Sequence, residues 1–217
     1  MLNDLNLPTL ISRIFVLLTA FAVHEFAHAW TADRFGDSTP RVNGRLTLNP
    51  LAHLDPIGSL MLVVAGFGWA KPVPVNPYAL ARRSPAAMMW VSLAGPFSNL
   101  LMAVAAAVPF QLGLVSVFNA RPQPGDILPS LDLLLFEFIF INLILMLFNL
   151  IPIAPLDGEK IAYHLLPPSG QQFLDNIRPY GPMILLAVLF LVPYLGFNLL
   201  GAVLGPPLQA LLGLLVG

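Results

Sequence analysis

The sequence predicts an all-α polytopic membrane protein with about four to six membrane helices, a small β-hairpin and a re-entrant segment. Of its 217 residues, 57% are hydrophobic and only 10% are charged, whereas a soluble domain carries roughly 25% charged residues. Several apolar stretches reach about 20 residues, the length that crosses a bilayer. No stretch is polar enough for a soluble domain, so we expect residues 1–217 to form one membrane-embedded domain.

Composition excludes several classes of function. The net charge is −1 and there is no basic run, so a nucleic-acid partner has no support. The chain has no cysteine, which excludes disulfides, zinc–thiolate sites and a thiol nucleophile. Ala20-Phe21-Ala22 is similar to a signal-peptide cleavage site, but the leading segment, with Asp4 and Arg13, is only weakly basic. We therefore expect the first helix to be retained.

The first membrane helix is predicted over about 10–33. Pro8 suits a first helical turn, and Gly36 suits the position just beyond the helix end. Residues 36–55 are polar, and Asn43-Gly44 is typical of a two-residue hairpin turn. The pattern predicts a small β-hairpin at the membrane surface.

Residues 56–69 are apolar but too short for a full crossing. Irregular backbone at membrane depth has to be buried in protein or line a wet cavity, so we expect a re-entrant or tilted segment. The next stretch, Lys71–Pro77, holds three prolines, which forbid a helix and favour an extended segment.

The rest of the chain predicts two full membrane helices over about 85–117 and 129–151, a short helix over 158–166, and a further apolar helix over about 181–200. The tail, 201–217, is apolar and rich in Gly and Pro, which leaves open a crossing, a re-entry or an interfacial position.

Basic residues indicate the orientation. If 56–69 re-enters, three loops on one face hold most of them, and the opposite turn holds Arg121. The residues in the three loops are Arg34, Arg41, Arg45, Lys71, Arg82, Arg83, Lys160 and Arg178. Basic loops stay in the cytoplasm, so the first helix is expected to end on the cytoplasmic side.

Three polar residues, His24, Glu25 and His28, interrupt the first apolar stretch. A charged side chain at mid-membrane costs about 2.5–3.5 kcal/mol, so packing alone does not explain them. Residues four apart share a helix face, so the two His can hold one ion. This is the His-Glu-x-x-His pattern of zinc peptidases, in which the Glu is the general base. A chance match is the alternative, and the membrane setting disfavours it.

A catalytic zinc usually has three protein ligands and a water, so a third ligand must come from elsewhere. Asp157 is the best candidate, because it follows an apolar helix and two prolines at a depth that matches His28. Its alternative role is an N-cap for the helix at 158–166. The two roles are compatible.

These motifs together resemble the site-2 protease family of intramembrane zinc metalloproteases, peptidase family M50. The second motif reads Asn149-Leu-x-Pro-x-x-Pro-Leu-Asp157-Gly158. Ala94-Gly95-Pro96-x-x-Asn99 is similar to the family's middle core helix, and the run from Gly68 to Val75 is similar to a segment of its compact bacterial members. The resemblance covers roughly residues 10–165, leaving 181–217 as additional C-terminal helices. The chain has no room for the PDZ or CBS domain of other members.

The resemblance implies one Zn²⁺ per chain, held by His24, His28 and Asp157, with Glu25 as general base. It implies a zinc metalloendopeptidase that cleaves transmembrane helices of a partner protein near the cytoplasmic face, as in regulated intramembrane proteolysis. The expected location is the bacterial inner membrane, with the lipid bilayer as its surroundings. The sequence names neither the substrate nor the oligomeric state.

Three further polar residues have two interpretations each. Asn149 and Asn99 are candidate substrate-binding amides, or they form hydrogen bonds between helices. His53 is a candidate fourth ligand or supporting group, or an interfacial loop residue. The Lys71–Pro77 stretch offers an edge for strand addition by a substrate, or it is a rigid surface loop.

Two other classes of function stay open. Intramembrane His and Asp also occur in metal or proton transporters, although no internal repeat is visible and the polar cluster lies near one face. The second alternative is an inactive homologue that only binds membrane helices. Glu25 discriminates among them, because hydrolysis needs a general base and transport does not.

Overall fold

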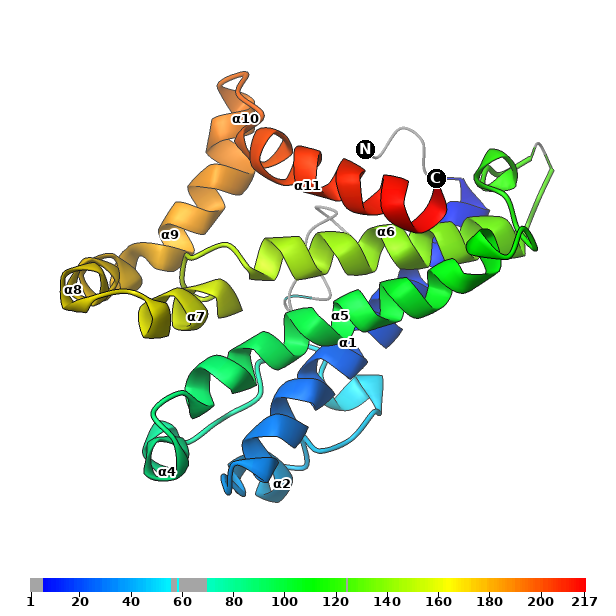
Figure 1. Ribbon diagram of the computed structural model, residues 1–217. Helices are drawn as coiled ribbons and strands as arrows, with labels where there is room; N and C mark the ends of the chain where they lie inside the picture. Colours follow the sequence, from blue (N-terminus) through cyan, green and yellow to red (C-terminus); the bar gives the residue numbers. More distant parts are fainter. Residues whose placement is uncertain (1–5, 56–57, 59–69, 124) are drawn as a thin grey trace.

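The computed structural model describes residues 6–55, 58, 70–123 and 125–217. These residues are mainly helical (Figure 1), and their β-pairing is limited to an isolated bridge between Leu54 and Ala70. The long helices are α1 (Leu7–Arg34), α5 (Ala87–Gln111), α6 (Leu131–Asn149) and α11 (Leu199–Val216). The short ones are α2 (Thr39–Val42), η1 (Pro50–Ala52), α4 (Pro77–Arg83), η2 (Val117–Asn119), α7 (Asp157–Leu165), α8 (Pro168–Ile177), η3 (Arg178–Tyr180), α9 (Gly181–Leu186), η4 (Ala187–Leu191) and α10 (Val192–Tyr194).

Five helical segments in the described part of the chain are long and apolar enough to cross a membrane, which confirms the predicted class. They are the four long helices and the run Pro168–Tyr194. The helices α1, α5 and α6 pack on one another and form the centre of the molecule. Small side chains such as Ala103 and Ala107 of α5 meet Ile139 and Leu143 of α6. Small residues let helix backbones approach closely, which is how membrane helices associate.

The first helix begins and ends as predicted. The Asn6 side chain accepts a hydrogen bond from the Thr9 amide, Pro8 lies in the first turn, and Gly36 takes a φ of 85° just beyond the end. The helix is long enough to carry His24, Glu25 and His28 well inside the molecule, and all three are buried.

The predicted hairpin is wrong. Described residues 36–55 form α2, turns and η1. A type I′ turn needs positive φ at both central residues, but Asn43 has a φ of −85° and only Gly44 is positive, at 66°. Gly44 instead ends α2, where the Arg45 amide bonds back to the Pro40 carbonyl at 2.8 Å. The same dipeptide therefore serves as a helix C-cap.

The predicted re-entrant segment, 56–69, lies almost wholly outside the described residues. Its neighbours are informative, because Leu54 pairs with Ala70 and the Lys71 amide donates to the His53 carbonyl at 2.7 Å. The chain therefore resumes at 70 beside the point it left at 54. From there 71–76 run without helix, as predicted, to α4.

Predictions for the later helices were good in position and poorer in extent. The helix predicted over 85–117 ends at Gln111, shortly before Gly113 with its φ of 68°. The helix predicted over 181–200 continues through α9, the π-helical η4 and α10, and it stops before Gly196. The tail forms α11, and its end meets α5, where the Gln111 side chain donates to the Leu215 carbonyl at 2.6 Å.

Candidate metal centre

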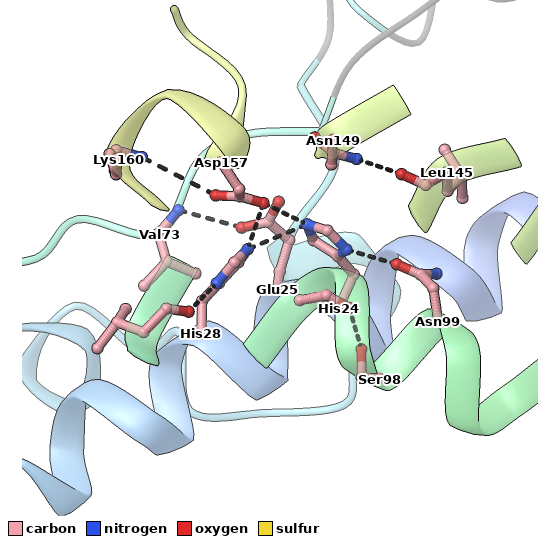
Figure 2. A network of polar contacts seen from close by, with 12 residues as sticks. His24, Glu25, His28, Val73, Ser98, Asn99, Leu145, Asn149, Asp157 and Lys160 are labelled. Atoms are coloured by element: carbon pink, nitrogen blue, oxygen red, sulfur yellow. Dashed lines mark hydrogen bonds and ion pairs between the residues drawn. The ribbon is translucent and has the colours of Figure 1, made fainter. Parts of the chain in front are cut away.

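Three electron-pair donors from distant parts of the chain converge at one point (Figure 2). His24 and His28 come from consecutive turns of α1, and Asp157 opens α7. The Nε2 atoms of the two imidazoles are 3.0 Å apart. Asp157 Oδ2 lies 3.3 Å from the first and 3.2 Å from the second. The ligand set predicted from the sequence is thus brought together.

The donor spacing fits a tetrahedral zinc ion. Zinc holds its nitrogen and oxygen ligands at about 2.0–2.1 Å, which places donors about 3.3 Å from each other. The three observed separations lie between 3.0 and 3.3 Å. Histidine and carboxylate are ordinary ligands of catalytic zinc, which keeps a fourth position for water.

The outer nitrogens of both imidazoles have partners that orient the rings. Nδ1 of His28 lies 2.7 Å from the Val91 carbonyl, and Nδ1 of His24 lies 2.6 Å from Asn99 Oδ1. A carbonyl oxygen can only accept, so Nδ1 of His28 carries a proton, and in the neutral imidazole Nε2 then keeps a lone pair. Metal-binding histidines usually have such a partner. With both rings neutral and protonated on Nδ1, two Nε2 lone pairs would face the Asp157 carboxylate, and a cation between the three donors would satisfy them.

Gly95 of α5 forms the floor under the two imidazoles. A Cβ atom built at this position would lie 2.6 Å from His24 Nε2 and even closer to His28 Nε2. Any larger residue would push the rings away from their present positions. The sequence shows this glycine, but its role follows only from the crossing of α1 and α5.

Asp157 reaches the histidines because α7 starts tightly against the end of α6. A Cβ atom at Gly158 would collide with the Leu150 carbonyl, so only glycine allows this approach. The N-cap of α7 is Leu156, which makes no side-chain capping bond. Asp157 is buried, and its Oδ2 lies within 3.3 Å of both Nε2 atoms. A buried carboxylate needs a compensating partner, and a metal cation held by the three donors would supply one.

Glu25 lies beside the donor cluster and is 8% exposed. Its Oε2 accepts a hydrogen bond from the Val73 amide at 3.1 Å. Val73 belongs to the extended residues 71–76, which we call the strap. The strap is anchored at both ends by buried side chains. Arg45 donates to the carbonyls of Ala52, Lys71 and Pro72, and Asp37 accepts from the Asn76 amide at 2.6 Å.

The remaining predicted site residues are placed differently. Asn149, at the end of α6, lies near Asp157, and its Nδ2 donates to the Leu145 carbonyl at 2.9 Å. Asn99 is fully buried behind His24, with its amide bonded to Asn142 at 2.8 Å. His53 is fully buried and bonds the Thr47 carbonyl, so it belongs to the loop that supports the strap. Substrate binding by Asn149 and Asn99 stays a prediction.

Sequence reasoning missed several contributors to the site. The Val91 carbonyl and the Val73 amide are backbone groups, which no side-chain pattern can indicate. Lys160 is 3.9 Å from Asp157 Oδ1, and its i,i+3 spacing was a usable signal. The hydrogen bond between Asn142 of α6 and Asn99 of α5 appears only in three dimensions.

Comparison with known proteins identifies similar chains. The chain is 41% identical over 180 residues to "Putative zinc metalloprotease YwhC" of Bacillus subtilis, and the match covers 83% of this chain and 80% of that protein. It is 33% identical over 209 residues to "Putative zinc metalloprotease Rip2" of Mycobacterium tuberculosis strain H37Rv, covering 90% and 74%. Rip2 of Mycolicibacterium smegmatis is 33% identical over 184 residues, covering 82% and 66%. No family model matches the chain, and no solved structure gives a significant match.

Proposed function

Because the chain belongs to the site-2 protease family of zinc metalloproteases, we propose that it hydrolyses peptide bonds within or near the transmembrane helices of substrate proteins. It is a zinc metalloendopeptidase and an integral membrane protein. The observation that carries the proposal is the depth of the site. His24, Glu25 and His28 lie inside a helix of membrane-spanning length and are at most 8% exposed.

The roles of the residues follow from their donor atoms. Nε2 of His24, Nε2 of His28 and Oδ2 of Asp157 would hold the zinc. When bound, zinc would act as a Lewis acid that polarises the scissile carbonyl and makes a water molecule acidic. Glu25 would take the water proton on its carboxylate and pass it to the leaving amine. The Val73 amide, bonded to Glu25 Oε2, holds that carboxylate in place.

The substrate has to unwind before it can be cut. A helix hides its carbonyls in its own hydrogen bonds, and the freed backbone needs new partners in a medium without water. The strap is extended and has one amide at the general base, so its backbone can pair with an extended substrate. Asn149, at the open end of α6, would donate its amide to the substrate after releasing the Leu145 carbonyl.

The basic loops support a cytoplasmic position of the site in a bacterial inner membrane. Arg41 and Arg45 follow α1, and Arg82 and Arg83 precede α5, so both groups lie at the end of the helices that is nearer the donor cluster. Positive loops are retained in the cytoplasm. Cleavage would therefore release a substrate fragment on the cytoplasmic side, the outcome used in regulated intramembrane proteolysis.

A comparison of membrane-protein fragments tests the proposal. Cells that express the wild-type chain or Glu25→Gln would be analysed by mass spectrometry for new termini. We expect new termini inside or beside apolar segments in the wild type, and none of them in the variant. New termini confined to soluble domains would show a metalloprotease that does not cut within membranes. Zinc or proton flux that survives Glu25→Gln, without new termini, would favour a transporter.

A further inference from the structure

His24 is the end of a chain of buried hydrogen bonds that crosses all three central helices. Its Nδ1 lies 2.6 Å from Asn99 Oδ1 on α5. Asn99 Nδ2 donates to Asn142 Oδ1 on α6 at 2.8 Å, and Asn142 Nδ2 donates to the Phe138 carbonyl at 2.8 Å. Asn99 and Asn142 are both 0% exposed. We call these three bonds the relay.

The direction of the relay is fixed at its far end. The Phe138 carbonyl can only accept, so the Asn142 amide must point toward it and its oxygen must point toward Asn99. The Asn99 amide then donates to that oxygen, and its own oxygen is left facing His24. Nδ1 of His24 therefore has to donate. A neutral imidazole that is protonated on Nδ1 keeps its lone pair on Nε2, the atom that faces the donor cluster.

The second histidine gives an internal comparison. The Nδ1-protonated form of His28 is fixed by a single contact, because its Nδ1 faces the Val91 carbonyl directly at 2.7 Å. The partner of His24 is an amide, which on its own could present either its oxygen or its NH₂ group. Only the fixed orientation of Asn142 removes this choice.

We propose that Asn142 is a positioning residue, which acts through Asn99 to set the tautomer and the ring orientation of His24 for zinc. The inference rests on the proposed function, because it takes His24 as a zinc ligand. The side chain of Asn142 bonds Asn99 and the Phe138 carbonyl and none of the three zinc donors, so we expect it to act on zinc affinity through Asn99. A purely structural interhelical amide would affect stability and leave zinc affinity unchanged.

The test uses two matched substitutions on α6. Asn142→Leu breaks the relay, whereas Glu137→Leu removes a different buried polar group of the same helix, the partner of Arg13 at 3.1 Å on α1. Both variants would be purified in detergent and their folding checked by thermal unfolding. Zinc affinity would be measured by competition with a chelator. We expect about 10- to 100-fold weaker zinc binding in Asn142→Leu, the range for groups that orient metal ligands, and wild-type affinity in Glu137→Leu.

A double variant tests whether Asn142 acts through Asn99. In an Asn99→Leu background the relay is already cut, so adding Asn142→Leu should weaken zinc binding no further. If Asn142→Leu does not fold, Asn142→Ala makes the same break with a smaller side chain. Wild-type zinc affinity in folded Asn142→Leu, or in folded Asn142→Ala, would overturn this inference and leave the proposed function intact. Absence of zinc binding by the wild-type chain would overturn the proposed function together with it.

Discussion

At the scale of the residue, Gly95 controls how closely the two imidazoles approach α5. We predict that Gly95→Ala loses most of its zinc, because the added methyl group would overlap the Nε2 atoms of His24 and His28. Metal analysis of the purified variant measures this. Gly213→Ala is the control, since it also lies in a helix and its Cβ would meet nothing within 4 Å. A zinc-loaded Gly95→Ala protein would show that the donor cluster can move as a unit.

Asp157 distinguishes a zinc ligand from a helix cap. Asp157→Ala is expected to bind zinc weakly and to lose proteolysis, because one of three donors is gone. The loss of a cap would cost only about 0.5–2 kcal/mol of stability, and the structure gives the cap position to Leu156. Glu159→Gln is the control, since Glu159 is buried in the same helical turn and pairs with Arg178 at 2.6 Å instead. Full zinc content in Asp157→Ala would leave the centre with only two known ligands.

At the scale of the element, the strap connects Glu25 to the surface loops. Arg45 is 4% exposed and donates to three carbonyls, and each buried acceptor left without a partner costs about 1–3 kcal/mol. We predict that Arg45→Met keeps its zinc, because no ligand lies on the strap, and loses much of its proteolytic rate, because Val73 no longer holds Glu25. Zinc content and cleavage rate, measured on the same sample, check this.

Arg41→Met is the matched control for the strap. Arg41 lies in the same loop but is largely exposed, and it pairs with Asp33 at 2.6 Å. A surface pair of this kind contributes about 0–1 kcal/mol, so its loss should leave the rate near that of the wild type. Equal rates in Arg45→Met and Arg41→Met would mean that the strap does not position Glu25.

The elements also show what sequence could predict. The helix that carries His24 and His28 was placed well, because Pro8 and Gly36 mark its ends chemically. The hairpin failed because Asn43-Gly44 supplies one positive φ, which suits a helix end as well as a turn. The helix predicted over 181–200 was placed correctly but ends at Tyr194, because an even apolar composition does not reveal where a membrane helix stops.

At the scale of the whole molecule, the pairing of Leu54 with Ala70 constrains topology. The chain has no cysteine, so single cysteines can report the side of each loop. We predict that cysteines at Ser38 and Ser84 label from the cytoplasm and that one at Gln123 labels from the other side, since α5 lies between the last two. Labelling of positions 38 and 84 from opposite faces would mean that 56–69 crosses the membrane.

The site as a whole was predictable only in part. His24, Glu25, His28 and Asp157 belong to strong motifs, so the sequence predicted that they lie close together, as they do in the structure. Asn142 carries no such signal, because a single amide on an apolar helix has many uses. Its alignment with Asn99 depends on how α5 crosses α6, and the geometry of that crossing cannot be predicted from the spacing of residues within either helix.

The central claim is that Glu25 is the general base of a zinc-dependent cleavage, and Glu25→Gln tests it most directly. A general base contributes typically about 10²–10⁴-fold to the rate, and Gln keeps the size of Glu without its charge. Zinc content and fragment yield from a co-expressed single-span substrate would be measured for both proteins. The account predicts a folded, zinc-loaded variant that hardly cuts. Near-normal cutting by the zinc-loaded variant would contradict it.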